Sequence, residues 1–400
     1  MFVFLYILLA TFMFYFTDGY IQIGGFGFMY RYFFGIAIIG VAFLKFLVKP
    51  NMGRLSRVFS GTLALSLSYV IPVIYSMFLW IFNTVSIKFM TKGFFYTAYI
   101  VIALLTSASS LYMFGRKSIL YTTVAMGIAN TLIMIPVALG GGVGTFFKEF
   151  IDLVITFGDT TGELMRKVEV HDLTFAFGLV LLFAIIEKDL IGRLYIFPIA
   201  LFFVLLGLKR ISVAGIILSA VIFFVLCRLK GETCKKIMYI SSGIIVFVTF
   251  SYILAIRSGL FTYLEEIGLD TKGRDIIYGY LNGIFEISPL FMGKGLGFSN
   301  EPWDLPIYSK LVQDAYHNEF LRMYIELGFI GYFIWIFLHL VYRLIYFTNK
   351  KVKNGLIFFV LSIYCYITYA TDNTYYYFYI NFAIFLLSMY GLLELDDEVP

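Results

Sequence analysis

Charged residues are scarce in this 400-residue sequence: Asp, Glu, Lys and Arg make up 14%, whereas 61% of the residues are hydrophobic. A soluble domain of this length needs a charged surface to stay dispersed, so the composition excludes that class. The cysteines are few and scattered (Cys227, Cys234 and Cys365), which excludes a disulfide framework and a zinc site. Low-complexity segments and repeats of about 20–50 residues are also absent, which excludes solenoids.

Long apolar runs recur from one end of the chain to the other. A helix of about 20 residues crosses a hydrocarbon core, and it satisfies its own backbone polar groups there. We therefore predict an all-α, polytopic membrane protein that forms one domain over residues 1–400, with its first run retained as a span. The predicted spans number about twelve: 1–17, 24–48, 58–82, 94–114, 118–140, 172–186, 190–207, 211–227, 237–256, 323–346, 355–370 and 374–393.

Lysine and arginine are concentrated in alternate loops, which predicts the orientation of the chain. The loops within 45–57, 116–117, 187–193, 228–236 and 343–353 hold sixteen Lys and Arg against three acidic residues. Short loops rich in Lys and Arg stay on the cytoplasmic side. Both termini are therefore predicted to be cytoplasmic.

The two longest polar segments, 141–171 and 257–322, then face outward as extracytoplasmic loops. The smaller contains the amphipathic stretch "FFKEFIDLVITF". The larger contains "GRDIIYGYLNGIFEIS", whose apolar residues recur at helical spacing, and this predicts a helix lying on the membrane or on the bundle.

Several cations break the orientation pattern because they lie on the predicted outer side. Lys209 and Arg210 in "LLGLKRISVAG" either extend to headgroup phosphates or form an anion clamp. Arg274 opens the amphipathic helix, where it opposes the helix dipole, and it either pairs with a neighbouring aspartate or binds a ligand. Arg31 is expected to extend to the membrane surface. The glycines of "FMGKGLGFSN" have neither the spacing nor the strand–turn–helix context of a nucleotide site.

The stretch "DAYHNEFLRMYIELGFIGYFIWIF" carries a histidine and three charges up to the edge of an apolar run. On one continuous helix, His317 and Tyr324 share a face with two glycines that would admit a second helix. Glu319, Arg322 and Glu326 form an ion-pair ladder on the opposite face. A lone histidine is usually structural, but the outer location and the adjacent Asn318 favour a functional role.

Three of these blocks resemble the bacterial O-antigen polymerase and O-antigen ligase superfamily. "AYHNEFLRMYIELGFIG" is similar to its His-Asn block, "KGRDIIYGYLNGIFEISPLFMGKGLGFSN" to its arginine helix and glycine turn, and "GLKRISVAG" to its basic pair. The weaker block "VEVHDLTFAFGL" departs from the usual Pro-Asn. The resemblance covers about residues 160–345 and is only hydropathic before that.

The resemblance implies a metal-independent glycosyltransferase with a GT-C-like architecture and no cofactor. It would join polyprenyl-diphosphate-linked repeat units outside the plasma membrane, with a flippase and a chain-length regulator as further partners and no nucleic acid. Carried over to this chain, His317 would activate the acceptor hydroxyl and Arg210, Arg274 and Lys209 would bind the diphosphate. Asn318, Tyr324, Glu319 and Arg322 would support them.

Two alternatives remain open at the level of sequence. A ligase, which transfers the glycan to a lipid or cell-wall acceptor, shares the same chemistry. A flippase or secondary transporter also has about twelve spans, but it is expected to show internal repeats and ionisable groups near the middle of the membrane.

Overall fold

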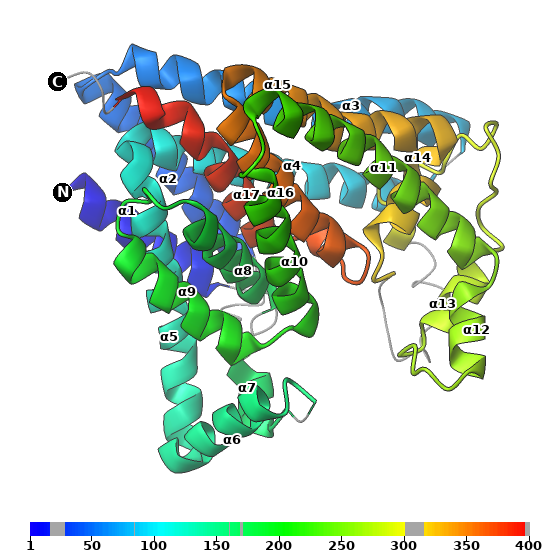
Figure 1. The fold of residues 1–400 in the computed structure, drawn as a ribbon, viewed down its shortest axis with the longest axis horizontal. Helices are drawn as coiled ribbons and strands as arrows, with labels where there is room; N and C mark the ends of the chain where they lie inside the picture. Colours follow the sequence, from blue (N-terminus) through cyan, green and yellow to red (C-terminus); the bar gives the residue numbers. More distant parts are fainter. Residues whose placement is uncertain (17–28, 84, 160, 169–170, 301–315, 397–400) are drawn as a thin grey trace.

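The computed structural model describes residues 1–16, 29–83, 85–159, 161–168, 171–300 and 316–396, and those residues contain helices and turns but no strand (Figure 1). Six apolar helical segments in this part of the chain are long enough to cross a membrane, as expected for a multi-pass protein. They are α2 (Met29–Val48), α3 (Met52–Phe82), α4 with α5 (Ile87–Phe114 and Ser118–Gly141), α11 (Gly231–Arg257), α14 with α15 (Glu319–Ile336 and Arg343–Lys350) and α16 (Val352–Tyr369).

Shorter apolar helices fill the remaining predicted spans. They are α1 (Phe2–Tyr15), α8 (His171–Ile186), α9 (Arg193–Gly207), α10 (Arg210–Leu226) and α17 (Phe378–Tyr390). Gly115, with φ of 56°, begins the turn that separates α4 from α5. The starts of α3 and α4 lie several residues before the predicted 58 and 94, because these helices continue beyond their apolar windows.

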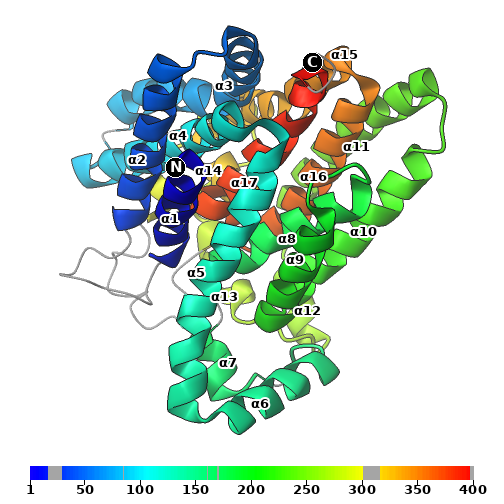
Figure 2. The same cartoon turned by 90° about the vertical axis from the view of Figure 1, so that its left-hand side faces the viewer.

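The connections between helices gather at two opposite ends of the bundle. At one end, Arg116 donates to the backbone carbonyl of Asp189 (3.0 Å), and Lys353 pairs with Glu187 (2.9 Å). These contacts join three of the basic loops. The short helices α6 (Val143–Ile155), α7 (Glu163–Val168), α12 (Leu260–Glu266) and α13 (Arg274–Leu281) lie at the other end, whereas α15 lies away from them (Figures 1 and 2). Basic loops and long polar segments are therefore separated as the alternation predicts.

Helices at the centre of the bundle are buried on all sides, whereas outer helices expose apolar side chains. α16 and α17 are buried along almost their whole length. By contrast, Phe33 on α2, Phe78 on α3 and Phe247 on α11 are more than half exposed. An apolar exterior of this kind is suited to a hydrocarbon solvent rather than to water.

Both long polar segments form short helices. Segment 141–171 forms α6 (Val143–Ile155) over its amphipathic stretch and then α7 (Glu163–Val168). Segment 257–322 forms α12 (Leu260–Glu266), which the hydrophobic pattern did not predict, and α13 (Arg274–Leu281).

The helix α14 breaks at Gly328, whose φ of 70° and ψ of −172° are not helical. The freed carbonyls of Ile325 and Glu326 accept hydrogen bonds from the backbone N–H groups of Lys294 (3.0 Å) and Gly295 (2.7 Å). The Phe329 N–H donates in turn to the carbonyl of Phe291 (2.8 Å). The glycine turn is therefore a backbone partner of the broken helix, which satisfies polar groups at membrane depth.

The predicted continuous helical face from His317 to Gly331 is wrong. His317 lies before the helix, Asn318 is its N-cap, and the break at Gly328 interrupts the face. Among the described residues, the two glycines meet different elements: the backbone of Met292 approaches Gly328, whereas the ring of Tyr75 on α3 approaches Gly331. The projection was wrong because it assumed unbroken helical periodicity.

Substituting Gly328 with Ala is expected to destabilise the protein. A Cβ there would lie 2.2 Å from the backbone carbon of Met292, and the backbone angles alone cost about 1–3 kcal/mol for a non-glycine residue. Thermal unfolding of the detergent-purified protein should therefore shift to lower temperature. Gly279→Ala in α13, where a Cβ would meet nothing within 4 Å, is the control. Equal unfolding temperatures for both variants would contradict the role of the break.

Candidate functional site

His317 lies at the polar end of the bundle in a strained backbone conformation. Its φ of 48° is in the left-handed region, which non-glycine residues seldom adopt. Its N–H donates to the Asn373 side-chain oxygen (3.0 Å), and its ring Nδ1 lies 3.7 Å from Asp372 Oδ1. The side chain keeps 27% of its surface exposed. An imidazole held beside a carboxylate and still open to solvent can exchange protons with a ligand.

Neighbouring residues fix the backbone on both sides of His317. Asn318 is fully buried, and its side-chain oxygen caps α14 by accepting from the Leu321 N–H (3.1 Å). The Tyr278 hydroxyl donates to the Tyr316 carbonyl (3.1 Å). Burial raises the pKa of Tyr278, so this phenol remains a donor at neutral pH. The helix cap and the hydrogen bond from α13 together hold the backbone of His317 in its strained conformation.

Asp372 is the partner that the sequence reasoning missed. It lies in the short turn between α16 and α17, where its Oδ1 accepts from the Asn373 N–H (2.7 Å) and from the Tyr377 hydroxyl (3.2 Å). The only sequence signal was a polar "TDN" in a short connection on the predicted outer side.

Arg274 meets the same turn from the opposite side. Its guanidinium donates to the carbonyl of Thr371 (2.9 Å). Of the two alternatives for Arg274, the pairing with a neighbouring aspartate is not seen in the described residues: Asp270 pairs with Lys272, and Asp275 accepts from the Thr271 hydroxyl. The turn Thr371–Asn373 therefore brings Arg274 and His317 together although they are 43 residues apart in sequence (317 − 274).

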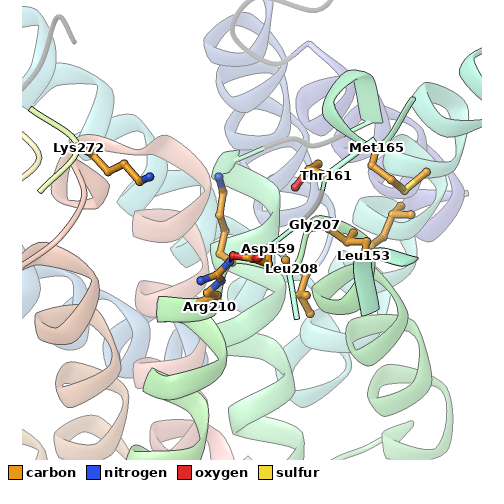
Figure 3. Close-up of a pocket in the computed structure, with 11 residues that line it drawn as sticks. Leu153, Asp159, Thr161, Met165, Gly207, Leu208, Arg210 and Lys272 are labelled. Carbon is orange, nitrogen blue, oxygen red and sulfur yellow. Dashed lines mark hydrogen bonds and ion pairs between the residues drawn. The ribbon is translucent and has the colours of Figure 1, made fainter. Parts of the chain in front are cut away.

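Arg210 and Lys209 line a cavity of about 380 Å³ between segment 141–171 and the start of α10 (Figure 3). Arg210 Nη2 lies 2.9 Å from Asp159 Oδ1, and its Nε donates to the Phe157 carbonyl (3.0 Å). Lys272 enters the cavity from the opposite side (Figure 3). Three cations and Asp159 thus line one cavity, and Lys272, which pairs with Asp270, is two residues from Arg274.

Arg31 is not at the membrane surface as expected, but buried with an opposite charge. Its Nη1 lies 3.4 Å from Asp172 Oδ2, and its Nη2 donates to the Tyr32 hydroxyl (2.8 Å). The charge of Arg31 is therefore balanced inside the protein.

The predicted ladder of Glu319, Arg322 and Glu326 lies inside the protein rather than towards lipid. Arg322 lies 3.8 Å from Glu319 and 3.7 Å from Glu326, and its guanidinium stacks 4.0 Å from the centre of the Tyr376 ring. Glu326 also accepts the N–H groups of Gly297 (3.0 Å) and Ser299 (3.1 Å). The ladder is thus part of the frame under the site.

Tyr324 also belongs to the frame. Its hydroxyl donates to the Glu286 carbonyl (2.9 Å), and its ring stacks on Phe291 at 5.6 Å. It therefore holds the stretch that leads into the glycine turn. In the described part of the chain, no three His, Cys, Asp or Glu side chains are grouped to bind a metal ion.

Comparison with known families identifies the segment that carries most of these residues. Residues 195–336 match the family model described as O-antigen ligase. Over this segment the chain is similar to the O-antigen polymerase and ligase superfamily. The match includes Lys209, Arg210, Arg274 and His317, whereas the Asp372 turn lies beyond it. No curated protein and no solved structure matches the chain significantly.

Replacing Arg322 with Met is expected to lower the free energy of unfolding by about 3–5 kcal/mol, because two buried carboxylates lose their counter-charge. Thermal or denaturant unfolding in detergent measures the loss. The triple variant Glu319→Gln, Arg322→Met, Glu326→Gln should recover most of it, since the amide oxygen introduced at position 326 could still accept from Gly297 and Ser299. A single variant as stable as the parent would show that the ladder does not stabilise the fold.

Proposed function

We propose that the protein is a polymerase that joins polyprenyl-diphosphate-linked oligosaccharide repeat units at the outer face of the bacterial plasma membrane. The similarity of residues 195–336 to the O-antigen ligase family supports glycosyl transfer from a lipid-linked glycan. The observation that carries the proposal is that the His317–Asp372 pair shares its turn with Arg274, two residues from Lys272 of the cation-lined cavity. A proton acceptor and an anion site are the two elements that transfer from a diphosphate requires.

The proposed reaction forms one bond and breaks one. The acceptor hydroxyl oxygen attacks the anomeric carbon of the donor sugar, and the bond from that carbon to the diphosphate oxygen breaks. His317 takes the hydroxyl proton, while Asp372 beside Nδ1 orients the ring and balances the imidazolium charge. A 3.7 Å separation can tighten into a hydrogen bond when substrate binds.

The leaving diphosphate gains negative charge, which fixed cations stabilise. Arg210, Lys209 and Lys272 around the cavity suit this role, and Arg274 links the cavity to the His317 turn. When substrate binds, a phosphate oxygen would replace Asp159 as the partner of Arg210. The cations would do the work of a metal ion, which makes the proposed reaction metal-independent.

The proposal includes twelve spans, a GT-C-like architecture and two cytoplasmic termini. The separation of basic loops from the site supports this orientation. A flippase would then supply the undecaprenyl-diphosphate-linked unit outside, and a chain-length regulator would act on the product. A capsule or exopolysaccharide is a fitting product class.

A ligase is the second candidate, favoured by the description of the matching family model. The two activities share donor and site and differ only in the acceptor. Incubation of purified protein with a defined lipid-linked repeat unit distinguishes them. A ladder of longer lipid-linked products supports a polymerase, whereas products formed only with a separate lipid or cell-wall acceptor support a ligase.

Replacing His317 with Ala is expected to reduce the transfer rate by about 10²–10⁴-fold, the usual contribution of a general base. Asp372→Asn should reduce it less, and the double variant should be no slower than His317→Ala because Asp372 acts through His317. Rates are measured by gel and mass spectrometry on equal amounts of folded protein. Glu266→Ala on exposed α12 is the control. Unchanged product from the His317 variant would refute the assignment.

Cysteine labelling in intact cells tests the orientation. In a background that lacks the native cysteines, Lys272→Cys should react with a membrane-impermeant maleimide added outside, because this side chain is exposed at the site end. Lys236→Cys in the exposed first turns of α11, at the basic-loop end, should react only after permeabilisation. The reverse pattern would invert the topology and remove the basis for an extracytoplasmic reaction.

A further inference from the structure

An apolar groove of about 330 Å³ lies far from the proposed reaction, at the end of the bundle that carries the basic loops. α2 and α3 both pack against α4, and the groove lies between them. Ala42, Ala108 and Ser109 are among its lining, and the large side chains of Phe43 and Phe59 stand exposed beside them. Small residues between aromatic ones leave a furrow that suits an alkyl chain.

Cations surround one end of this groove. Lys45 donates to the Met113 carbonyl, and Arg54 Nη1 donates to the Tyr112 carbonyl (3.3 Å), so both reach successive carbonyls at the end of α4. Tyr112 itself lines the groove, which places the two cations at its mouth. Lys49 is exposed in the connection between α2 and α3.

The helices that form the groove contain no acidic residue. Residues 19–148, which include α2, α3 and α4, hold neither Asp nor Glu. The mouth of the groove is therefore positive and its interior is apolar, and a ligand that complements both has an anionic head and a hydrocarbon tail. The positive-inside rule explains the cations at this end of the bundle, but it does not explain an apolar groove beside them.

We infer that this groove binds an anionic glycerophospholipid. One acyl chain lies between Phe43 and Phe59, and the phosphate lies against Lys45, Lys49 and Arg54. In the proposed orientation the lipid comes from the cytoplasmic leaflet. The inference depends on insertion of the chain in a membrane, and it is independent of the reaction proposed for His317.

Native mass spectrometry of the detergent-purified protein, titrated with phosphatidylglycerol or phosphatidylcholine, tests the site. Phosphatidylglycerol should bind more tightly by about fivefold or more, and salt should reduce the difference. Lys49→Gln should weaken phosphatidylglycerol about fivefold, the usual contribution of one cation near a lipid headgroup, whereas Lys236→Gln on α11 should not. Lys49 is exposed, so folding is expected to survive the change.

Ala108→Phe, which fills the groove, should abolish the preferred site, whereas Val221→Phe on the exposed side of α10 should leave it intact. Inorganic phosphate should not displace the lipid, because it lacks the chain. Equal affinity for both phospholipids, or the same loss with Lys236→Gln as with Lys49→Gln, would overturn the inference. Binding of a polyprenyl phosphate in place of phosphatidylglycerol would also overturn it.

Discussion

At Gly328, α14 stops bonding to itself and bonds to the segment around Gly293 and Gly295 instead. The end of the bundle that carries α12 and α13 depends on these hydrogen bonds, because they join the glycine turn of segment 257–322 to α14. A Cβ on Gly293 would lie 2.3 Å from the Gly328 nitrogen, so the two backbones approach as closely as glycine permits. Glu326 completes the joint by accepting two further N–H groups from the turn. The start of α14, and with it His317, is held in place from below.

The site built on this frame comes from five separate stretches of chain. Asp159, Arg210 and Asp372 belong to three different connections, whereas Lys272 and His317 lie far apart in segment 257–322. Their common property is position at one end of the bundle, where helices end and side chains can be both ordered and hydrated. Charges that lie deeper are matched inside the protein, as Arg31 is by Asp172 and Arg322 by its two glutamates.

The sequence by itself determined the class of the fold, the location of most helices and the separation of the loops. Apolar runs must become helices in lipid, because no other local structure satisfies the backbone there. The distribution of Lys and Arg then separates the loops into two sets, and contacts such as Lys353 with Glu187 agree with that division. The basic pair and the histidine block were also recognisable, because their chemistry is unusual for a chain so poor in charge. They lie within the segment that matches the O-antigen ligase family.

Only the tertiary structure decided how the His317 stretch is used. A helical projection assumes constant periodicity, so it could show neither the positive φ of His317 nor the break at Gly328. Asp372 lies 55 residues further along (372 − 317), and nothing in a short "TDN" connection tells which distant residue it contacts. The ladder of Glu319, Arg322 and Glu326 was visible in sequence, but its burial depends on the rings of α4 and the Tyr376 turn packing over it. Local chemistry is determined by spacing along the chain, whereas partners across the bundle are determined by packing, which spacing does not encode.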